Sequence, residues 1–172
     1  MFWNSKRKLV EYAEQEAKIN AQYQIDCADS LQRSSSTLFT LLLSGAGGGL
    51  ALSVSLFGNH SPQWLWLSVA AVSVYLFAIA GMLAYFCLQA QDLYPPANEP
   101  LNLYNDKNLL LGFYETRESE LSSRQRCIDR NIERNNNVAY WLNEASLYAT
   151  LTSLAFIAVA FFAYLLGSDA VL

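Results

Sequence analysis

The feature that most constrains this chain is an uncharged stretch from Ser34 to Gln91, in which no Asp, Glu, Lys or Arg occurs. A soluble domain carries about 25% charged residues along its whole length. This chain has 15% and places all of them outside that stretch. An ordinary globular enzyme, a disordered tail or a nucleic-acid-binding domain does not contain so long an uncharged apolar run. The sequence therefore predicts a small all-α integral membrane protein.

Three segments meet the length requirement of a helix that crosses a bilayer. A hydrocarbon core about 30 Å thick needs roughly 20 helical residues, because each residue rises about 1.5 Å. Apolar segments of that length cover residues 38–57, 64–88 and 145–166. The six residues between the first two, Gly58 to Gln63, include Gly and Pro and form only a tight hairpin. We expect three transmembrane helices.

The distribution of positive charge predicts the orientation of these helices. Five Lys and Arg residues precede the first span, six lie between the second and third spans, and none lies in the hairpin or the C-terminal tail. Because the cytoplasmic side retains the excess of Lys and Arg, the sequence predicts a multi-pass protein of a bacterial inner membrane with its N-terminus inside and its C-terminus outside.

This topology divides the chain into four parts. Residues 1–36 form a cytoplasmic helix that continues into the membrane, and residues 37–90 form the transmembrane hairpin. Residues 91–143 form a cytoplasmic Pro-rich linker and an amphipathic helix, and residues 144–172 form the third transmembrane helix and a short outer tail. The N-terminal helix is expected because residues 5–33 are rich in Ala, Glu, Gln and Lys and contain neither Gly nor Pro. The three cysteines are expected to be free thiols in a reducing compartment.

The second cytoplasmic segment carries a heptad-like pattern. Three prolines between Tyr94 and Pro100 predict a stiff linker. Beyond it, intervals of four and three residues within 115–143 predict a seam with two polar positions. Two interpretations stay open: a coiled coil between molecules, and packing on the N-terminal helix of the same chain. The seam residues are Leu121, Gln125, Ile128, Ile132 and Asn135.

A basic stripe accompanies this seam, because Arg126, Arg130 and Arg134 recur every four residues. One interpretation is a solvated face that pairs with the acidic residues of the N-terminal helix, Glu11, Glu14 and Glu16. The other is an anion site for a phosphorylated ligand or lipid head groups, since guanidinium groups bind phosphate bidentately.

The first span contains a cluster of small residues. In lipid, small residues let helix backbones approach closely, so the cluster predicts a helix-packing and oligomer interface. An alternative is that the glycines break the helix in mid-membrane, as in transporter sites lined by unwound backbone. The interface residues are Gly45, Gly47, Gly48 and Gly49, with Ala80 and Ala84 of the second span as a matching surface.

The residues for enzymatic chemistry are missing from these patterns. No Asp, Glu, Lys, Arg or His lies within the three spans, and the single His, His60, lies in the outer hairpin. We therefore expect a non-enzyme without catalytic residues, cofactor or metal. A pI near 4.9 gives no basic footprint for nucleic acid.

The leading functional expectation is a homo-oligomerising membrane effector or pore-forming component, controlled by its cytoplasmic helices. In architecture only, the outline is similar to small multi-span effectors of bacterial antiviral systems and to phage holins. The second expectation is a non-conducting anchor that recruits a cytosolic protein, and the third is a small-solute transporter. The expected partners are the lipid bilayer, further copies of the chain, and a cytosolic protein or anionic ligand.

Overall fold

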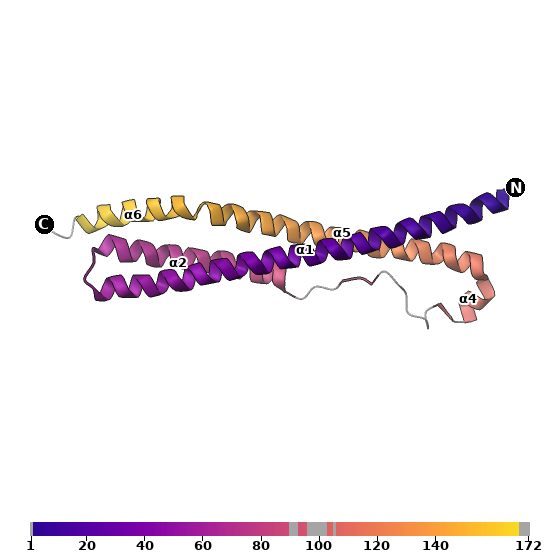
Figure 1. Ribbon diagram of the computed structural model, residues 1–172, viewed down its shortest axis with the longest axis horizontal. Coiled ribbons are helices and arrows are strands. Elements are labelled where there is room, and N and C mark those ends of the chain that lie inside the picture. The colour runs from indigo at the N-terminus through magenta and orange to yellow at the C-terminus, as the bar shows by residue number, and fades with distance from the viewer. Residues whose placement is uncertain (1, 90–92, 96–102, 105, 169–172) are drawn as a thin grey trace. The chain divides into compact units, whose positions relative to one another are not determined.

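A computed structural model of the chain describes residues 2–89, 93–95, 103–104 and 106–168. Within these residues the regular structure is helical and no strand occurs, which confirms the all-α expectation. The helices are α1 (Phe2–Gly58), α2 (Gln63–Leu83), the π-helix η1 (Ala84–Leu88), α4 (Asp106–Leu111), α5 (Phe113–Thr150) and α6 (Thr152–Ser168) (Figure 1).

The contacts divide the chain into two units, which we describe separately. The polar unit comprises Met1–Ser30 and Ala90–Asn137, and the apolar unit comprises Leu31–Gln89 and Val138–Leu172. Helices α1 and α5 each contribute one segment to each unit. Most of the expected Pro-rich linker, residues 96–102, lies outside the described residues.

Two helices are long and apolar enough to cross a membrane, Lys6–Gly58 and Gln63–Leu88. A third candidate is a bent pair of helices that meets the same criteria of length and apolarity only when taken together. If the pair is counted as one span, it consists of Phe113–Thr150 and Thr152–Leu165. The length and apolarity of these helices indicate a membrane protein with two or up to three transmembrane helices.

The helix break lies in the third apolar segment and not at the glycines of the first. Helix α1 passes through Gly45–Gly49 without interruption. The segment 145–166, expected as one helix, is instead bent by 44° between Thr150 and Thr152. The Tyr75 hydroxyl donates a hydrogen bond of 2.9 Å to the carbonyl of Tyr148, an acceptor that an unbroken helix would pair with the amide four residues on. Such insertion of a side chain into the helical ladder is a recognised cause of a kink.

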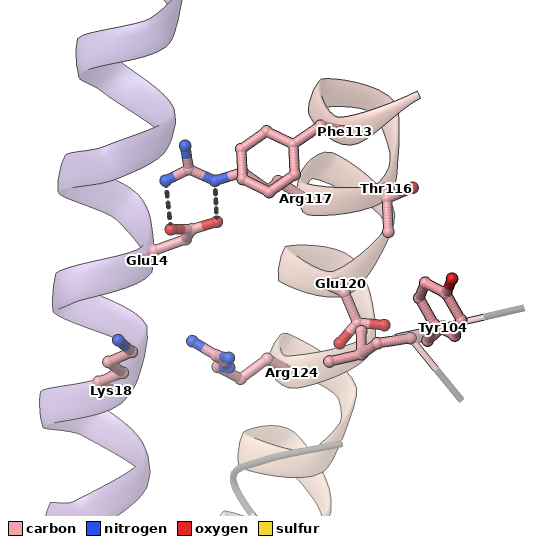
Figure 2. A pocket seen from close by; sticks show the side chains of 9 residues that line it. Glu14, Lys18, Tyr104, Phe113, Thr116, Arg117, Glu120 and Arg124 are labelled. Atoms are coloured by element: carbon pink, nitrogen blue, oxygen red, sulfur yellow. Dashed lines mark hydrogen bonds and ion pairs between the residues drawn. The ribbon is translucent and has the colours of Figure 1, made fainter. Parts of the chain in front are cut away.

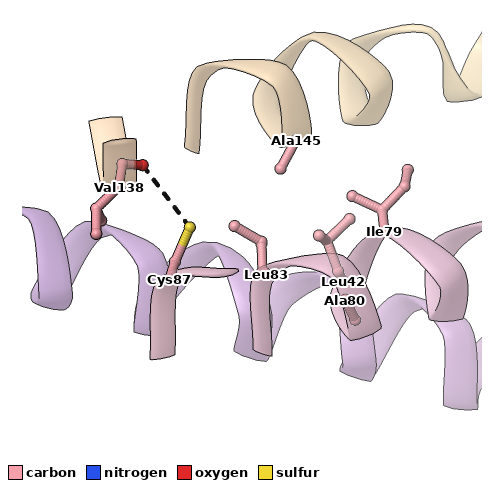
Figure 3. Packing of buried hydrophobic residues seen from close by; sticks show 7 residues of the cluster. All are labelled: Leu42, Ile79, Ala80, Leu83, Cys87, Val138 and Ala145. Atoms are coloured by element: carbon pink, nitrogen blue, oxygen red, sulfur yellow. Dashed lines mark hydrogen bonds between the residues drawn. The ribbon is translucent and has the colours of Figure 1, made fainter. Parts of the chain in front are cut away.

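Small and aliphatic side chains form the core of the apolar unit (Figure 3). Leu83 and Ala145 are fully buried, and Phe86 stacks on Trp141 with ring centroids 4.0 Å apart. Lipid tails are as apolar as these side chains, so close van der Waals packing has to hold such helices together. The buried members of the cluster are Leu42 of α1, Ile79, Ala80 and Leu83 of α2, Cys87 of η1, and Val138 and Ala145 of α5.

The glycines of α1 point to two different sides. A Cβ at Gly49 would overlap the Ser73 hydroxyl of α2, and a Cβ at Gly45 would lie 3.5 Å from Leu76 Cδ1. A Cβ at Gly47 or Gly48 would meet nothing within 4 Å. The GxxxG pair of α1 is therefore used for packing on α2 within the chain, whereas Gly47 and Gly48 are left open.

Because Gly49 is packed against α2 and Gly48 is open, we predict that Gly49→Ala destabilises the apolar unit and Gly48→Ala does not. The added methyl at position 49 displaces Ser73, and overpacking of this kind costs about 1–3 kcal/mol. Thermal unfolding of the two variants in detergent measures the difference. Equal unfolding temperatures for both variants would contradict the packing of α1 on α2.

The hairpin between α1 and α2 is closed by a Schellman motif. The Ser61 amide donates to the Leu56 carbonyl (3.1 Å) and the His60 amide donates to the Phe57 carbonyl (3.2 Å), which are the two bonds of that motif. His60 occupies the left-handed position with φ of 52°. The turn is therefore formed by His60 and not by Gly58, although glycine is the residue best suited to this conformation.

We predict that His60→Gly raises stability by about 1 kcal/mol, because an L side chain in the left-handed region costs roughly 1–2 kcal/mol and glycine loses some of that gain to chain entropy. His60→Val, whose branched side chain is still less tolerant of positive φ, is the opposite control. Thermal unfolding of the detergent-solubilised protein measures both changes, and the turn geometry is wrong if the valine variant is the more stable one.

Candidate functional site

The polar unit is held together by a narrow contact between α1 and α5. Ala17 and Ala21 of α1 pack against Ile128 of α5, with Leu121 partly buried beside them. Because alanine side chains are short, the two helix backbones approach closely at this point. Of the two interpretations of the seam, the structure shows packing on the N-terminal helix of the same chain.

The buried face of α5 matches the expected seam at some positions and is shifted by one residue at another. Of the seam residues, Ile128 and Asn135 are buried and Leu121 is partly buried. Gln125 and Ile132 are exposed, and Asn131 is buried instead of Ile132. In a seven-residue repeat, the second buried position of each repeat can follow the first by three or by four residues. The repeat alone therefore does not choose between Asn131 and Ile132. Hydropathy favoured Ile132, whereas the structure selects Asn131 because its amide finds partners there.

Those partners are the backbone groups of Tyr94. Asn131 Nδ2 donates to the Tyr94 carbonyl (3.0 Å), and the Tyr94 amide donates to Asn131 Oδ1 (3.1 Å). The Tyr94 ring also lies 4.8 Å from the guanidinium of Arg130. A buried amide with both functions satisfied avoids the penalty of an unpaired polar group. The start of the linker is thereby fixed to α5.

The second buried amide joins α5 to α1. Asn135 Nδ2 donates to the Gln24 backbone carbonyl (2.9 Å) and to Gln24 Oε1 (3.1 Å). Arg134 Nη1 donates to Asn135 Oδ1 (3.3 Å). These bonds fix the lengthwise position of one helix against the other, because a shift by one residue would leave the Asn135 amide unpaired.

A bidentate ion pair closes the other end of the contact. Arg117 Nε donates to Glu14 Oε1 (2.9 Å) and Arg117 Nη2 donates to Glu14 Oε2 (2.6 Å), as Figure 2 shows. Glu11 lies 3.8 Å from the same guanidinium. The hydrogen bonds from Arg117 lower the pKa of Glu14, against a smaller opposing effect of burial. The same bonds raise the pKa of Arg117.

The expected basic stripe does not converge on one site. Arg126 donates to the Ser123 hydroxyl (3.0 Å), Arg130 lies over Tyr94, and Arg134 contacts Asn135. Glu11 and Glu14 pair with Arg117 instead of with the stripe. The expectation that the stripe pairs with these two carboxylates is therefore wrong. The reason is rotational, because Arg117 lies on the buried face of α5 and the stripe lies beside it.

A pocket of about 440 Å³ opens between α1 and the start of α5 (Figure 2). Lys18 of α1 and Arg124 of α5 are directed into the same space from the two helices. The pocket also contains two large exposed rings, those of Phe113 and Tyr104. Its lining consists of Glu14, Lys18, Leu103, Tyr104, Phe113, Thr116, Arg117, Glu120 and Arg124.

A sharp corner before α5 positions the aromatic part of this pocket. Gly112 has a φ of 91°, in the region that favours glycine. The Thr116 hydroxyl donates to the Gly112 carbonyl (2.8 Å), and Asn108 Nδ2 donates to the Leu103 carbonyl (3.0 Å). Sequence reasoning missed this pocket. Its available signals were Gly112 next to Phe113 and the heptad-spaced pair Arg117 and Arg124.

The remaining predicted interface residues lie on α1, α2 and η1 in the apolar unit. Ala80 is buried in the core with the GxxxG face of α1 nearby, and Ala84 is half-buried at the start of η1. The described residues contain no group of three or more His, Cys, Asp or Glu side chains arranged to hold a metal. No known family model, curated protein or solved structure matches the chain.

The lowered pKa of Glu14 predicts a pH dependence of the polar unit. Because the pKa of Glu14 is lower in the folded state than its ordinary value of 4.5, the ionised carboxylate stabilises the fold at pH values above 4.5. This stabilisation is lost as the pH falls through the lower pKa of the folded state. We expect Glu14→Gln to lower the unfolding temperature at neutral pH and to match the unaltered chain in strong acid.

The matched control is Glu118→Gln, which removes the Lys6–Glu118 pair (3.3 Å). Those side chains are 43% and 55% exposed, against 22% and 23% for Arg117 and Glu14, so water screens them more strongly. Thermal unfolding at several pH values measures both variants. A difference between Glu14→Gln and the unaltered chain that does not change with pH would contradict the assignment.

Proposed function

We propose that the chain is a homo-oligomerising inner-membrane protein that forms a pore, acting as a membrane effector of the antiviral-defence or holin-like kind. In this proposal α1 lies at the contact between copies. The polar unit lies in the cytoplasm and controls the assembly. The observation that carries the proposal is the open side of α1 at Gly47 and Gly48, where a Cβ would meet nothing within 4 Å.

The open side of α1 is a continuous small-residue face. Ser44, Gly48, Ala51 and Ser55 are all exposed and follow one another at intervals of four, three and four residues, so they share one side of the helix. Small side chains give lipid tails little to pack against, but they allow the backbone of another helix to approach. Since Gly45 and Gly49 already serve α2, this second face supports contact with another copy.

The chemistry of this face supports a pore more than a coupled transporter. Its only polar groups are serine hydroxyls, which can line a narrow aqueous passage between several copies. Coupled transporters normally keep an ionisable residue at membrane depth, and none is present in the predicted spans. The transporter alternative also relied on a broken first span, whereas α1 is continuous there.

The polar unit supports a role in control. Helices α1 and α5 each contribute a segment to both units. A ligand or protein that alters their pairing in the polar unit therefore acts on helices that continue into the apolar unit.

The second candidate function is a non-conducting anchor that recruits a cytosolic protein. The observation that favours it is an exposed apolar stripe on the N-terminal part of α1, formed by Leu9, Tyr12, Ile19 and Tyr23. These residues recur at helical spacing, and each of them is more than half exposed. A stripe of this kind fits the apolar face of a partner helix.

Two glycine substitutions test the proposed oligomer. Gly48→Leu places a large side chain on the open face of α1, and Gly81→Leu does the same at an equally open glycine of α2. We expect the unaltered chain and Gly81→Leu to form a defined oligomer in mild detergent and Gly48→Leu to be reduced to monomer. The mass of the solubilised particle is the measurement.

Dye release from liposomes distinguishes a pore from an anchor. We expect the unaltered chain and Gly81→Leu to release a small trapped fluorophore, with at least a tenfold loss of release for Gly48→Leu. A monomeric unaltered chain refutes the oligomer. An intact oligomer that releases no dye and does not collapse the membrane potential when expressed in cells refutes the pore and favours the anchor.

A further inference from the structure

We propose that the pocket of the polar unit binds a small molecule in which a phosphate group is joined to a planar ring. In this site the phosphate lies between Lys18 and Arg124, and the ring lies against Phe113. The site supplies the chemical class of a controlling ligand for the proposed function. Binding itself rests on the polar unit alone, so it stands or falls independently of the pore.

The charged side chains around the pocket are unequally paired. The bidentate contact with Arg117 occupies both carboxylate oxygens of Glu14. Among the described residues, Lys18 and Arg124 have no hydrogen bond or ion pair of their own side chains, yet both are directed into the same space in Figure 2. Two facing cations repel each other, and an anion placed between them adds two attractions that outweigh this repulsion.

The carboxylates of the lining offset these cations only in part, and Glu14 attracts both Lys18 and Arg124 without a hydrogen bond to either. Glu120 also lines the pocket, but it is engaged in an interaction of its own. The lining residues carry three cations against two carboxylates, and setting aside the pair of Glu14 with Arg117 leaves two cations against one carboxylate. The position between Lys18 and Arg124 is therefore the one that favours an added anion. A guanidinium and an ammonium together suit phosphate, which accepts from both.

Two exposed rings supply the aromatic part of the site. Phe113 and Tyr104 are 77% and 78% exposed although both line the pocket. The guanidinium of Arg117 lies 5.5 Å from the centre of the Phe113 ring, within the range of a cation–π contact. A planar ring stacked on an exposed aromatic side chain recovers the burial that the empty pocket lacks.

The size and rigidity of the pocket fit a small molecule. Its volume of about 440 Å³ lies within the range of about 300–1,000 Å³ for ligand pockets in proteins. The Gly112 corner and the bonds of Thr116 and Asn108 hold the aromatic segment at the start of α5. A preformed site of this kind loses less entropy on binding.

Calorimetric titration of the full chain in detergent tests the site with four probes. Adenosine 5′-monophosphate carries both parts of the ligand, ribose 5-phosphate and adenosine carry one part each, and inorganic phosphate carries the charge alone. We expect the mononucleotide to bind at least about tenfold more tightly than any of the other three. Absence of binding, or equal affinity for the mononucleotide and inorganic phosphate, overturns the proposal.

Matched charge variants locate the binding. Lys18→Ala with Arg124→Ala removes the two facing cations, and Lys8→Ala with Arg126→Ala removes one exposed cation from each of the same helices outside the pocket. We expect at least about a tenfold loss of mononucleotide affinity in the first double variant, since charge-assisted hydrogen bonds are lost, and no loss in the second. Equal losses would show nonspecific attraction and overturn the assignment.

A ring variant separates the two halves of the site. Phe113→Ala is expected to weaken the mononucleotide about tenfold, since base stacking on aromatic side chains is sequence-tolerant and strong, while ribose 5-phosphate is unchanged. Thermal unfolding of each variant shows whether it retains the fold. If the double variant Lys18→Ala with Arg124→Ala fails to fold, Arg124→Gln is measured in its place. Glutamine keeps most of the side-chain stem and removes the charge. An unchanged mononucleotide affinity in Phe113→Ala overturns the stacking role.

Discussion

The close approach of α1 to its neighbours through small side chains is the contact on which both units depend. In the polar unit α1 contributes buried alanines, Ala17, Ala21 and Ala28, and in the apolar unit it contributes Ser35, Ala46 and Ser53. The physical reason differs between the two solvents. In water the contact removes apolar surface from solvent, whereas in lipid it gains van der Waals contact that only short side chains permit. Small side chains, alanine and serine, thus serve one helix in two environments.

Polar groups then select one arrangement among several that small side chains would allow. Alanine faces specify little, because they can slide past one another without a large loss of contact. Three polar contacts are each satisfied only when the partners are aligned as they are here. They are the bonds of Asn135 to Gln24, the bonds of Asn131 to Tyr94 and the pair of Arg117 with Glu14. Buried amides that fix register are well attested in helical assemblies. The polar unit thereby acquires a defined register at three points along α5.

The features that the fold leaves unused are the ones that point to function. One side of α1 packs on α2 through Gly45 and Gly49, while Gly47 and Gly48 face open space. In the polar unit, Glu14 is fully engaged by Arg117, while Lys18 and Arg124 face each other across a pocket with exposed rings. Neither the open glycine face nor the facing cations improve the stability of a single chain. In the proposals made above, another copy covers the glycine face and an anion lies between the two cations.

The sequence by itself determined the helical class, the candidate spans and the tight hairpin, because uncharged apolar length and turn residues act locally and need no partner. Three of the five seam residues, Leu121, Ile128 and Asn135, follow a seven-residue repeat and lie on the buried or partly buried face of α5. Only the tertiary structure decided that Asn131 is buried in place of Ile132, because its amide is satisfied by the distant backbone of Tyr94. The same holds for the bend near Leu151, beside which the hydroxyl of Tyr75 donates to the carbonyl of Tyr148, and for the pocket, which depends on α1 and α5 meeting with Lys18 opposite Arg124. Each of these involves partners far apart in the chain, and hydropathy and spacing carry no information about such pairs.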